Sequence, residues 1–285
     1  MPKFNSLRVN YDVQMQQVRL GVVDFLNTVP LIDGLEMIDG ISLLPKVPSS
    51  LIGCLEDGVV DLALASSIDY QKSSLDLRIL RVGLLSSDGH TLTVRLCSRK
   101  PIETVQEVHC DIDSHTSIAL LQIVMKDVYD TEITIVPTEI RHLSEDKNDW
   151  PDSILMIGDK VVSSTNEIEF PYELDLGEAW KKQTGLPFVF AVWMGRVDLA
   201  QAIVDDIAMS LERQLRKNMQ RLEQVISTSA MKRGWDKQEA LEYVGETMQY
   251  MWTDRHESSL ALFYKRANEM GIISSPFEIQ FFDWK

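Results

Sequence analysis

The chain has 285 residues, enough for two modest lobes or one large domain around a hydrophobic core. Hydrophobic residues make up 45% of it and charged residues 25%, close to ordinary globular usage. The formal net charge of −15 repels nucleic-acid phosphates and anionic lipid, so neither nucleic acid nor a membrane surface is an expected partner. An anionic ligand would have to be held by local donors against this field.

Short apolar runs alternate with amphipathic segments through the first two-thirds of the chain, which predicts α/β units with covered sheets. Strands are predicted at 18–23, 43–47, 61–65, 77–85, 92–97, 107–110, 132–136, 154–157 and 188–193. Helices are predicted between them at 30–36, 50–56, 117–128 and 178–183.

The last third is helical in pattern. Apolar residues from Leu199 to Ile226 recur every three or four positions, which predicts one long amphipathic helix. Two further helices are predicted at 241–251 and 260–270, the second ended by Gly271. The methionine and aromatic residues of these segments are interpreted as core packing.

Two extended segments, 91–98 and 187–195, are candidates for crossings between lobes. The first leads into a β/α block and the second leads out of it. The expected organisation is a discontinuous lobe I of residues 1–96 and 196–285, with lobe II of residues 97–195 inserted into it. Two lobes joined by a two-strand hinge are typical of a ligand-binding cleft.

Five polar clusters lie where strands are predicted to end. They are Asn27 with Thr28, Ser66 with Ser67, the stretch 86–91 with Gly89 and His90, the stretch 113–117 with Ser114, His115, Thr116 and Ser117, and Gly158 with Asp159. Ligands of α/β folds gather at such strand ends, so the clusters predict a donor-rich pocket for a small carboxylate. Taken singly, each has a structural alternative as a helix cap, a turn, a salt-bridge partner or a solvated loop residue.

Other chemistries have no sequence support. The chain contains no H-E-x-x-H, G-x-S-x-G or G-x-x-x-x-G-K-[ST] motif, and no G-x-G-x-x-G follows a strand. Its five histidines lack ligand spacing, so no metal site is expected. Three cysteines without C-x-x-C spacing predict thiols in a reducing compartment. No signal-like N-terminus and no apolar run near the ~20 residues of a membrane span is present, which predicts a cytoplasmic protein.

Several motifs resemble those of the chorismate dehydratase family, over roughly residues 18–275. They are LGVVDFLNTVPL at 20–31, DGVVDLALASSIDY at 57–70, DIDSHTSIALL at 111–121, MIGD at 156–159 and DLGEAWKKQTGLPFVFAVW at 175–193. The resemblance implies the two-lobed α/β fold of type II periplasmic binding proteins. It also implies a lyase without metal or organic cofactor, which dehydrates chorismate to 3-[(1-carboxyvinyl)oxy]benzoate in the futalosine route to menaquinone. The expected partner is this small molecule, and the chain is a monomer or a homodimer.

The resemblance also implies roles for residues. Asn27 corresponds to the family's active-site asparagine, and Thr93 stands where the family usually has a serine whose hydroxyl could assist departure of hydroxide. The remaining expected substrate-binding residues are Thr28, Ser66, Ser67, Gly89, His90, Ser114, His115, Thr116, Ser117 and Asp159. The chain departs from the family pattern at His90, Thr93, His115, which replaces an arginine, and Lys160.

Two other functions stay open at this point. One is a 1,4-dihydroxy-6-naphthoate synthase-like enzyme of the same pathway, which requires His90 or His115 to face the cleft as a base. The other is a non-catalytic protein that binds a small carboxylate.

Overall fold

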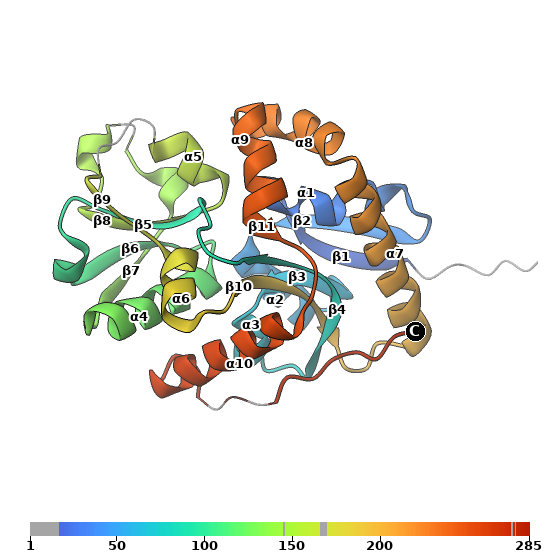
Figure 1. Cartoon of the computed structure of the whole chain (residues 1–285). Coiled ribbons are helices and arrows are strands. Elements are labelled where there is room, and N and C mark those ends of the chain that lie inside the picture. Colours follow the sequence, from blue (N-terminus) through green and yellow to red (C-terminus); the bar gives the residue numbers. More distant parts are fainter. Residues whose placement is uncertain (1–16, 145, 166–169, 275, 277) are drawn as a thin grey trace, which may run out of the picture.

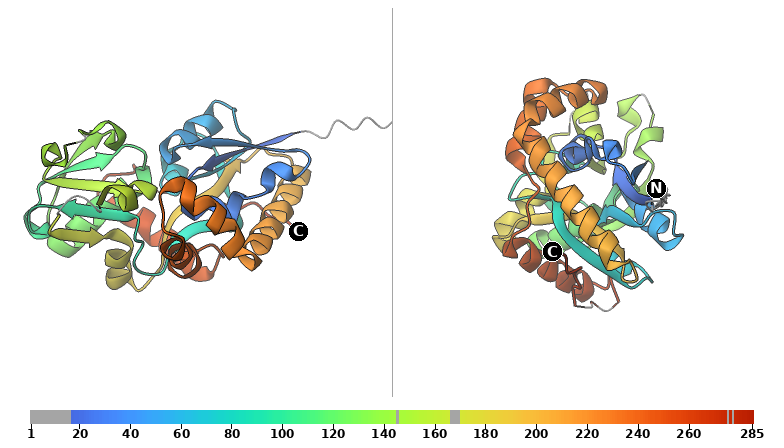
Figure 2. Two further views of the ribbon diagram at one scale, coloured as in Figure 1. Left: turned by 90° about the horizontal axis from the view of Figure 1, so that it is seen from above. Right: turned by 90° about the vertical axis from the view of Figure 1, so that its right-hand side faces the viewer.

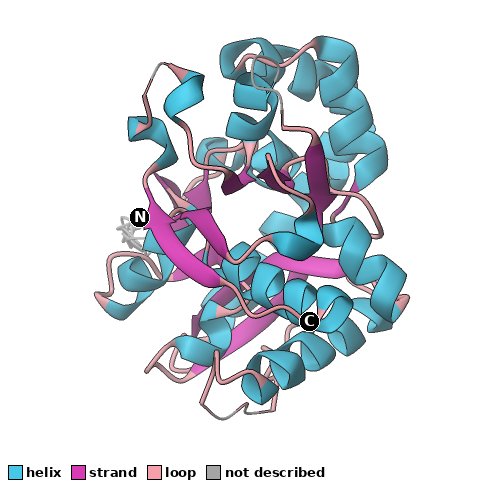
Figure 3. Cartoon of the chain, turned by 90° about the vertical axis from the view of Figure 1, so that its left-hand side faces the viewer, coloured by secondary structure: helices cyan, strands magenta, loops and turns pink. Residues whose placement is uncertain are grey.

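The computed structural model describes residues 17–285 apart from 145, 166–169, 275 and 277. Two β-sheets form two lobes that lie side by side (Figures 1 and 2). Helices lie along the outer sides of the strands (Figure 3). No helix in the described part of the chain is both long and apolar enough to cross a membrane.

The first sheet has the strand order β11-β4-β10-β3-β1-β2. Its strands are β1 (Val18–Val23), β2 (Ile41–Lys46), β3 (Leu62–Ser66), β4 (Leu77–Ser87), β10 (Phe188–Arg196) and β11 (Met248–Gln249). β1 is parallel to β2 and β3, whereas β10 is antiparallel to β3 and β4.

The second sheet has the order β7-β6-β8-β5-β9. Its strands are β5 (Val94–Ser98), β6 (Glu107–Asp111), β7 (Thr134–Thr138), β8 (Ser153–Ile157) and β9 (Tyr172–Asp175). The chain enters this sheet between β4 and β5 and returns between β9 and β10. The second lobe is therefore inserted into the first, and two segments connect them.

The helices are α1 (Val29–Ile32), α2 (Pro48–Glu56), α3 (Asp69–Lys72), α4 (His115–Tyr129), α5 (Asp159–Thr165), α6 (Leu176–Thr184), α7 (Gln201–Gln220), α8 (Leu222–Ala230), α9 (Lys237–Glu242) and α10 (Asp254–Glu269). In Figure 1, α4 and α5 lie with the second sheet, and α7 to α10 pack around the first. The C-terminal helical segment thus belongs to the first lobe.

Strand β3 shows how the first sheet builds two cores. Successive side chains of a strand point to opposite faces. Leu62 and Leu64 accordingly join one buried cluster, which includes residues of α7, α8 and α9. Ala63 and Ala65 join the other, which continues through Trp180 into the second lobe.

The predicted C-terminal helices differ from the observed ones in two places. The long helix expected through Ile226 is interrupted at Arg221, whose φ of −120° and ψ of 29° separate α7 from α8. The helix expected at 241–251 ends at Glu242, and a π-helical turn at Tyr243–Thr247 follows it. Met248 then pairs with Ser87 in the sheet, so tertiary pairing overrides the local helical pattern.

Most other boundaries shift by one or two residues, but α10 begins six residues before its predicted start, α1 ends four residues before its predicted end, and β10 ends three residues later than predicted. The elements α3, α5, β9 and β11 were not expected. The strand expected at 92–97 begins at Val94, because Leu92 has a φ of +65° and forms a turn. The predicted lobe boundaries at 97 and 195 stay a prediction. Because β10 pairs with β3 and β4, we propose that the inserted lobe ends before Phe188.

Gly177 allows helix α6 to approach the crossing segment that follows β4. A Cβ atom at this position would lie 2.6 Å from the carbonyl oxygen of Gly89 and 2.8 Å from Oγ of Ser87. Both distances are well inside van der Waals contact, so only glycine fits without a shift of the backbone.

We predict that Gly177→Ala lowers the free energy of unfolding by about 1–3 kcal/mol, because the added methyl group overpacks this contact. Urea unfolding followed by circular dichroism measures the change. Gly53→Ala in α2 is the matched control, because a Cβ there has no neighbour within 4 Å. This control should stabilise the protein by about 0.5–1 kcal/mol. Equal effects of the two substitutions would contradict the steric argument.

His256 fixes the start of α10 against the first sheet. Its Nδ1 accepts a hydrogen bond from the backbone N–H of Thr253 at 3.1 Å, which completes a capping box. Its Nε2 lies 3.0 Å from Oγ of Ser86. Burial lowers the pKa of His256 below its usual value, since the protonated ring is poorly solvated there.

We predict that the free energy of unfolding falls as pH drops below about 6.5, since the unfolded chain then binds a proton that the folded His256 resists. The stability linked to this residue is complete above that pH and lost below it. His256→Gln should flatten this part of the profile, measured by urea unfolding between about pH 5 and 8. Replacing the exposed His142 by Gln should leave the slope as in the wild type. A slope retained in His256→Gln would assign the effect to another group.

Candidate active site

A cavity that is partly open to solvent lies between the two sheets. The parallel strands β1 and β3 of the first sheet end there, as do β6 and β8 of the second. Ser66 is the last residue of β3, and Gly158 directly follows β8. At least one residue of each predicted polar cluster lines this cavity, and other residues of the same clusters do not.

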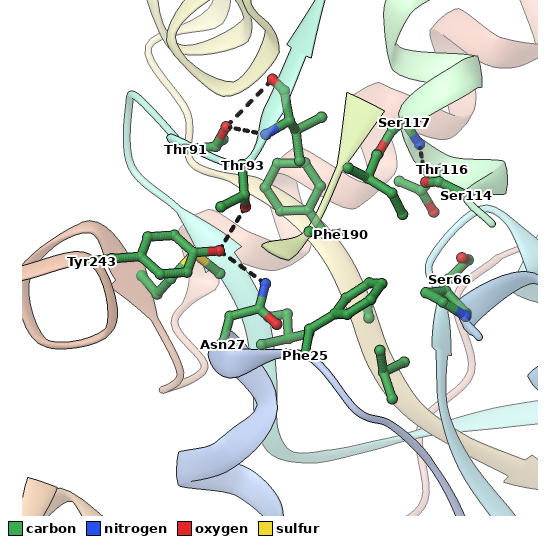
Figure 4. A pocket seen from close by; sticks show the side chains of 18 residues that line it. Phe25, Asn27, Ser66, Thr91, Thr93, Ser114, Thr116, Ser117, Phe190 and Tyr243 are labelled. Atoms are coloured by element: carbon green, nitrogen blue, oxygen red, sulfur yellow. Dashed lines mark hydrogen bonds between the residues drawn. The ribbon is translucent and has the colours of Figure 1, made fainter. Parts of the chain in front are cut away.

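Three hydroxyl or amide side chains meet at one end of the cavity (Figure 4). Nδ2 of Asn27 lies 3.0 Å from Oη of Tyr243, and Oγ1 of Thr93 lies 2.7 Å from the same oxygen. Oδ1 of Asn27 is buried and has no hydrogen-bond partner among the described residues. Asn27 follows β1 of the first lobe, Thr93 lies in the crossing segment directly before β5, and Tyr243 joins them.

A second polar group lies across the cavity, at the start of α4 (Figure 4). Ser114 caps this helix, because its Oγ accepts a hydrogen bond from the backbone N–H of Ser117 at 3.1 Å. The hydroxyls of Ser66 and Ser117 have no hydrogen-bond partner among the described residues, and both residues line the cavity. Thr116 also lines it, but its Oγ1 accepts from the backbone N–H of Ile68 at 3.3 Å.

The wall between these two polar ends is apolar. Phe25 and Phe190 lie between them (Figure 4), with Val23, Leu85 and Ile157 nearby. Gly158 permits the position of Phe25, because a Cβ there would lie 2.9 Å from its ring. No Asp, Glu, Lys, Arg or His lines the cavity within the described ranges. The cavity is therefore uncharged, in a chain of net charge −15.

Several predicted site residues have their polar atoms engaged elsewhere. Oγ1 of Thr28 lies 2.7 Å from the carbonyl oxygens of both Val23 and Phe25, so it stabilises the turn after β1. Ser67 donates its hydroxyl proton to the carbonyl oxygen of Val189 at 2.8 Å. Neither residue lines the cavity.

Gly89 and His90 also lie outside the cavity. The carbonyl oxygen of Gly89 accepts a hydrogen bond from Ser87. The side chain of His90 is 52% exposed and lines a neighbouring hollow on the other side of Tyr243.

His115 is paired with a carboxylate of the first lobe instead of facing the cavity. Its Nδ1 lies 2.7 Å from Oδ1 of Asp69. Burial raises the pKa of Asp69, and the hydrogen bond from His115 acts in the opposite direction. The histidine that replaces the family's arginine thus joins the two lobes.

Asp159 forms a second bridge between the lobes. Its carboxylate accepts a hydrogen bond from the backbone N–H of Leu26 at 3.1 Å and from the indole N–H of Trp235 at 2.9 Å. Burial raises the pKa of Asp159, while these donors lower it. Asp159 does not line the cavity.

Lys160 lies outside the cavity as well. Its Nζ is 2.8 Å from Oδ2 of Asp113 and also pairs with Asp111. In the part of the chain that the structure describes, no three His, Cys, Asp or Glu side chains are grouped so that they could hold a metal ion.

Tyr243 and the aromatic residues Phe25 and Phe190 line the cavity but are not among the residues predicted for the site. Tyr243 lies in the C-terminal helical segment, where its spacing is that of an ordinary core residue. Phe25 directly precedes the quoted Asn27 turn, and Phe190 lies in a strand that reads as apolar core. No local pattern distinguishes these three from packing residues.

Solved structures share the two-lobed arrangement. A protein of Archaeoglobus fulgidus superimposes with a TM-score of 0.74 at 16% identity, covering 90% of this chain and 98% of that one. A Candida albicans protein described as having the generic periplasmic binding protein fold matches with a TM-score of 0.66 at 11% identity, covering 92% of each chain. The chain is thus a two-lobed protein of the periplasmic-binding-protein-like class, with an uncharged cavity between its lobes, and the predicted fold class is confirmed.

The sequence comparison identifies the family. The family described as menaquinone biosynthesis matches residues 18–269, so the chain belongs to it. A chorismate dehydratase of Thermus thermophilus is 28% identical over 236 residues, which are 77% of this chain and 84% of that protein.

We predict that Asp159→Ala lowers the free energy of unfolding by about 1–3 kcal/mol, because two donors at the lobe interface lose their acceptor. Thermal and urea unfolding measure the change. Asp152→Ala is the matched control, since its carboxylate pairs with Lys100 at the surface and should change stability by less than about 0.5 kcal/mol. Equal effects would show that the Asp159 contacts contribute no more than a surface ion pair.

Proposed function

We propose that this protein dehydrates chorismate to 3-[(1-carboxyvinyl)oxy]benzoate. Membership of the menaquinone biosynthesis family and the similarity to a chorismate dehydratase support this activity. The observation that carries the proposal is the form of the cavity. It offers two separate polar ends joined by an apolar, aromatic wall, which suits a ring with a carboxylate at one side and a hydroxyl at another.

The start of α4 is the proposed carboxylate end. A helix N-terminus carries unpaired N–H groups and a partial positive charge, and both favour an anion. The partner-free hydroxyls of Ser66 and Ser117 add donors there, and Ser114 shapes the end by capping the helix. No side-chain cation lines this end among the described residues, so neutral donors carry the anion.

Asn27 and Thr93 are the proposed catalytic residues at the opposite end. The reaction breaks the bond between a ring carbon and its hydroxyl oxygen and removes a proton from the neighbouring ring carbon, and water is the second product. The electrons of the C–H bond complete the aromatic ring, which supplies much of the driving force. The enolpyruvyl carboxylate of the substrate is the proposed proton acceptor, so the protein supplies orientation, desolvation and hydrogen bonds to the departing hydroxyl.

The other predicted site residues have framework roles in this proposal. Thr28 and Ser67 hold strand ends, His115 and Asp159 hold the lobes together, and Gly89 and His90 belong to the crossing segment. Operation in the futalosine route and a cytoplasmic location are further parts of the proposal.

A 1,4-dihydroxy-6-naphthoate synthase-like activity requires a histidine base in the cleft. His115 is bonded to Asp69, and His90 lines a different hollow, so neither supports that reading. The experiment below also tests whether the protein only binds a ligand without converting it.

We predict that the purified protein consumes chorismate, measured as loss of its cyclohexadiene absorbance and appearance of the substituted benzoate by mass spectrometry. Asn27→Ala should lower kcat by about 100-fold or more, because a group that binds the reacting hydroxyl is removed. Asn148→Ala, at an exposed position of the 3-10 turn Lys147–Asp149, should match the wild type.

Binding of chorismate without turnover at high protein concentration would reject the enzyme and favour a binding protein. Turnover unaffected by Asn27→Ala would keep the activity and remove Asn27 from the mechanism.

A further inference from the structure

The hydroxyl of Tyr243 lies between the two proposed catalytic residues. The side chain is 1% exposed, and its Oη is within hydrogen-bond distance of both Asn27 and Thr93. Its ring stacks on Trp235 with centroids 4.9 Å apart and an interplanar angle of 8°. Trp235 is itself held by its hydrogen bond to Asp159. The position of the hydroxyl is therefore fixed from three sides.

Tyr243 also begins the π-helical turn Tyr243–Thr247. π-turns inside helical segments are rare and occur often at functional sites. Here the turn ends α9 and directs the chain into β11, beside the cavity. Tyr243 itself keeps helical backbone angles directly after α9, with φ −59° and ψ −54°, and its hydroxyl contacts Thr93 of the crossing segment.

The hydrogen bonds have a direction that follows from the groups involved. The Asn27 amide nitrogen can only donate, so Oη of Tyr243 accepts this bond. Burial raises the pKa of Tyr243, so its hydroxyl keeps its proton. Oγ1 of Thr93 lies 2.7 Å from Oη, a distance that allows either oxygen to donate. Because Oη already accepts from Asn27, we assign its proton to Thr93. The chain of donors runs from Asn27 through Tyr243 to Thr93.

This direction determines what the cavity offers a ligand. Asn27 has its donor engaged, so its buried Oδ1 remains as an acceptor without a partner. Thr93 has accepted a bond, so its own proton remains as a donor. A hydroxyl group is the substituent that can donate to the first and accept from the second at once.

We propose that Tyr243 is a positioning residue that sets this acceptor and donor pair, and that the pair recognises the hydroxyl of a ring alcohol. The inference deepens the proposed function and rests on it. During dehydration, the hydroxyl oxygen takes the electron pair of the breaking C–O bond. The donor held at Thr93 then stabilises the negative charge on that oxygen, and the ring proton taken up by the substrate carboxylate balances the departing hydroxide as water.

The test is Tyr243→Phe, which keeps the ring and its stacking and removes only the hydroxyl. We expect kcat for chorismate to fall about 10- to 100-fold, since two hydrogen bonds that orient the catalytic groups are lost. The reaction product carries the same carboxylates but has no ring hydroxyl. Its Kd, measured by calorimetry, should therefore change by less than about twofold.

Tyr250→Phe is the matched control. Tyr250 is also buried, and its Oη has no hydrogen-bond partner among the described residues and does not line the cavity. Removing that hydroxyl should leave kcat and the product Kd unchanged.

The outcomes separate the two proposals. If Tyr243→Phe keeps the wild-type kcat, the inference is wrong and the proposed function stands. If kcat and product affinity fall together, the substitution has damaged the cavity in general, and the inference is again wrong while the proposed function stands. If the wild type binds chorismate without turnover, the proposed function fails. The inference then requires Tyr243→Phe to weaken chorismate but not the product. Binding of neither compound overturns both.

Discussion

The carboxylate of Asp175 ties together the two segments by which the chain crosses between the lobes. One oxygen accepts hydrogen bonds from the backbone N–H groups of Thr91 and Leu92, at 2.8 and 2.9 Å, and from the Thr91 hydroxyl at 3.0 Å. The other caps α6 through the N–H of Glu178. These bonds stabilise Leu92 at a φ of +65°, which costs a leucine about 1–2 kcal/mol. The turn that they stabilise places Thr93 next to Tyr243, so the geometry of this end of the cavity depends on a residue outside the cavity.

The uncharged cavity contrasts with the carboxylates around it. Asp69 and Asp159 lie just outside the lining, and each is engaged by donors that reduce the unfavourable free energy of burying a charge. Asp113 is paired with Arg141 and Lys160. The negative groups nearest the site thus serve as bridges within and between the lobes. The cavity itself is left with neutral polar groups, in a chain of net charge −15.

The sequence predicts the strands and helices that have a periodic apolar pattern, and the polar residues that directly follow strands. Apolar alternation located the strands, and polar strand-end clusters located Asn27, Ser66 and Ser114 correctly at one cavity. It could not locate Tyr243, because its contacts are with Asn27 and Thr93, 216 and 150 positions away, and its own spacing is that of a core residue. Nor could it show that His115 is bonded to Asp69, since the two lie 46 positions apart on different lobes. The break between α7 and α8 at Arg221 could not be predicted either, because one continuous apolar pattern runs through both helices.

Hydroxyl groups near the cavity divide according to what their protons already bond. Thr28 and Ser67 donate to backbone carbonyl oxygens, so these hydroxyls stabilise turns and are unavailable to a ligand. Ser66 and Ser117 have no partner among the described residues, and Oγ1 of Thr93 lies 2.7 Å from Oη of Tyr243. Residue type alone makes these five side chains equivalent, because serine and threonine serve equally as caps, turns and ligand donors. Their hydrogen-bond partners in the folded protein distinguish the hydroxyls that stabilise turns from those that line the cavity. The cavity thus has two polar ends, one at the start of α4 and the other where Asn27, Thr93 and Tyr243 meet.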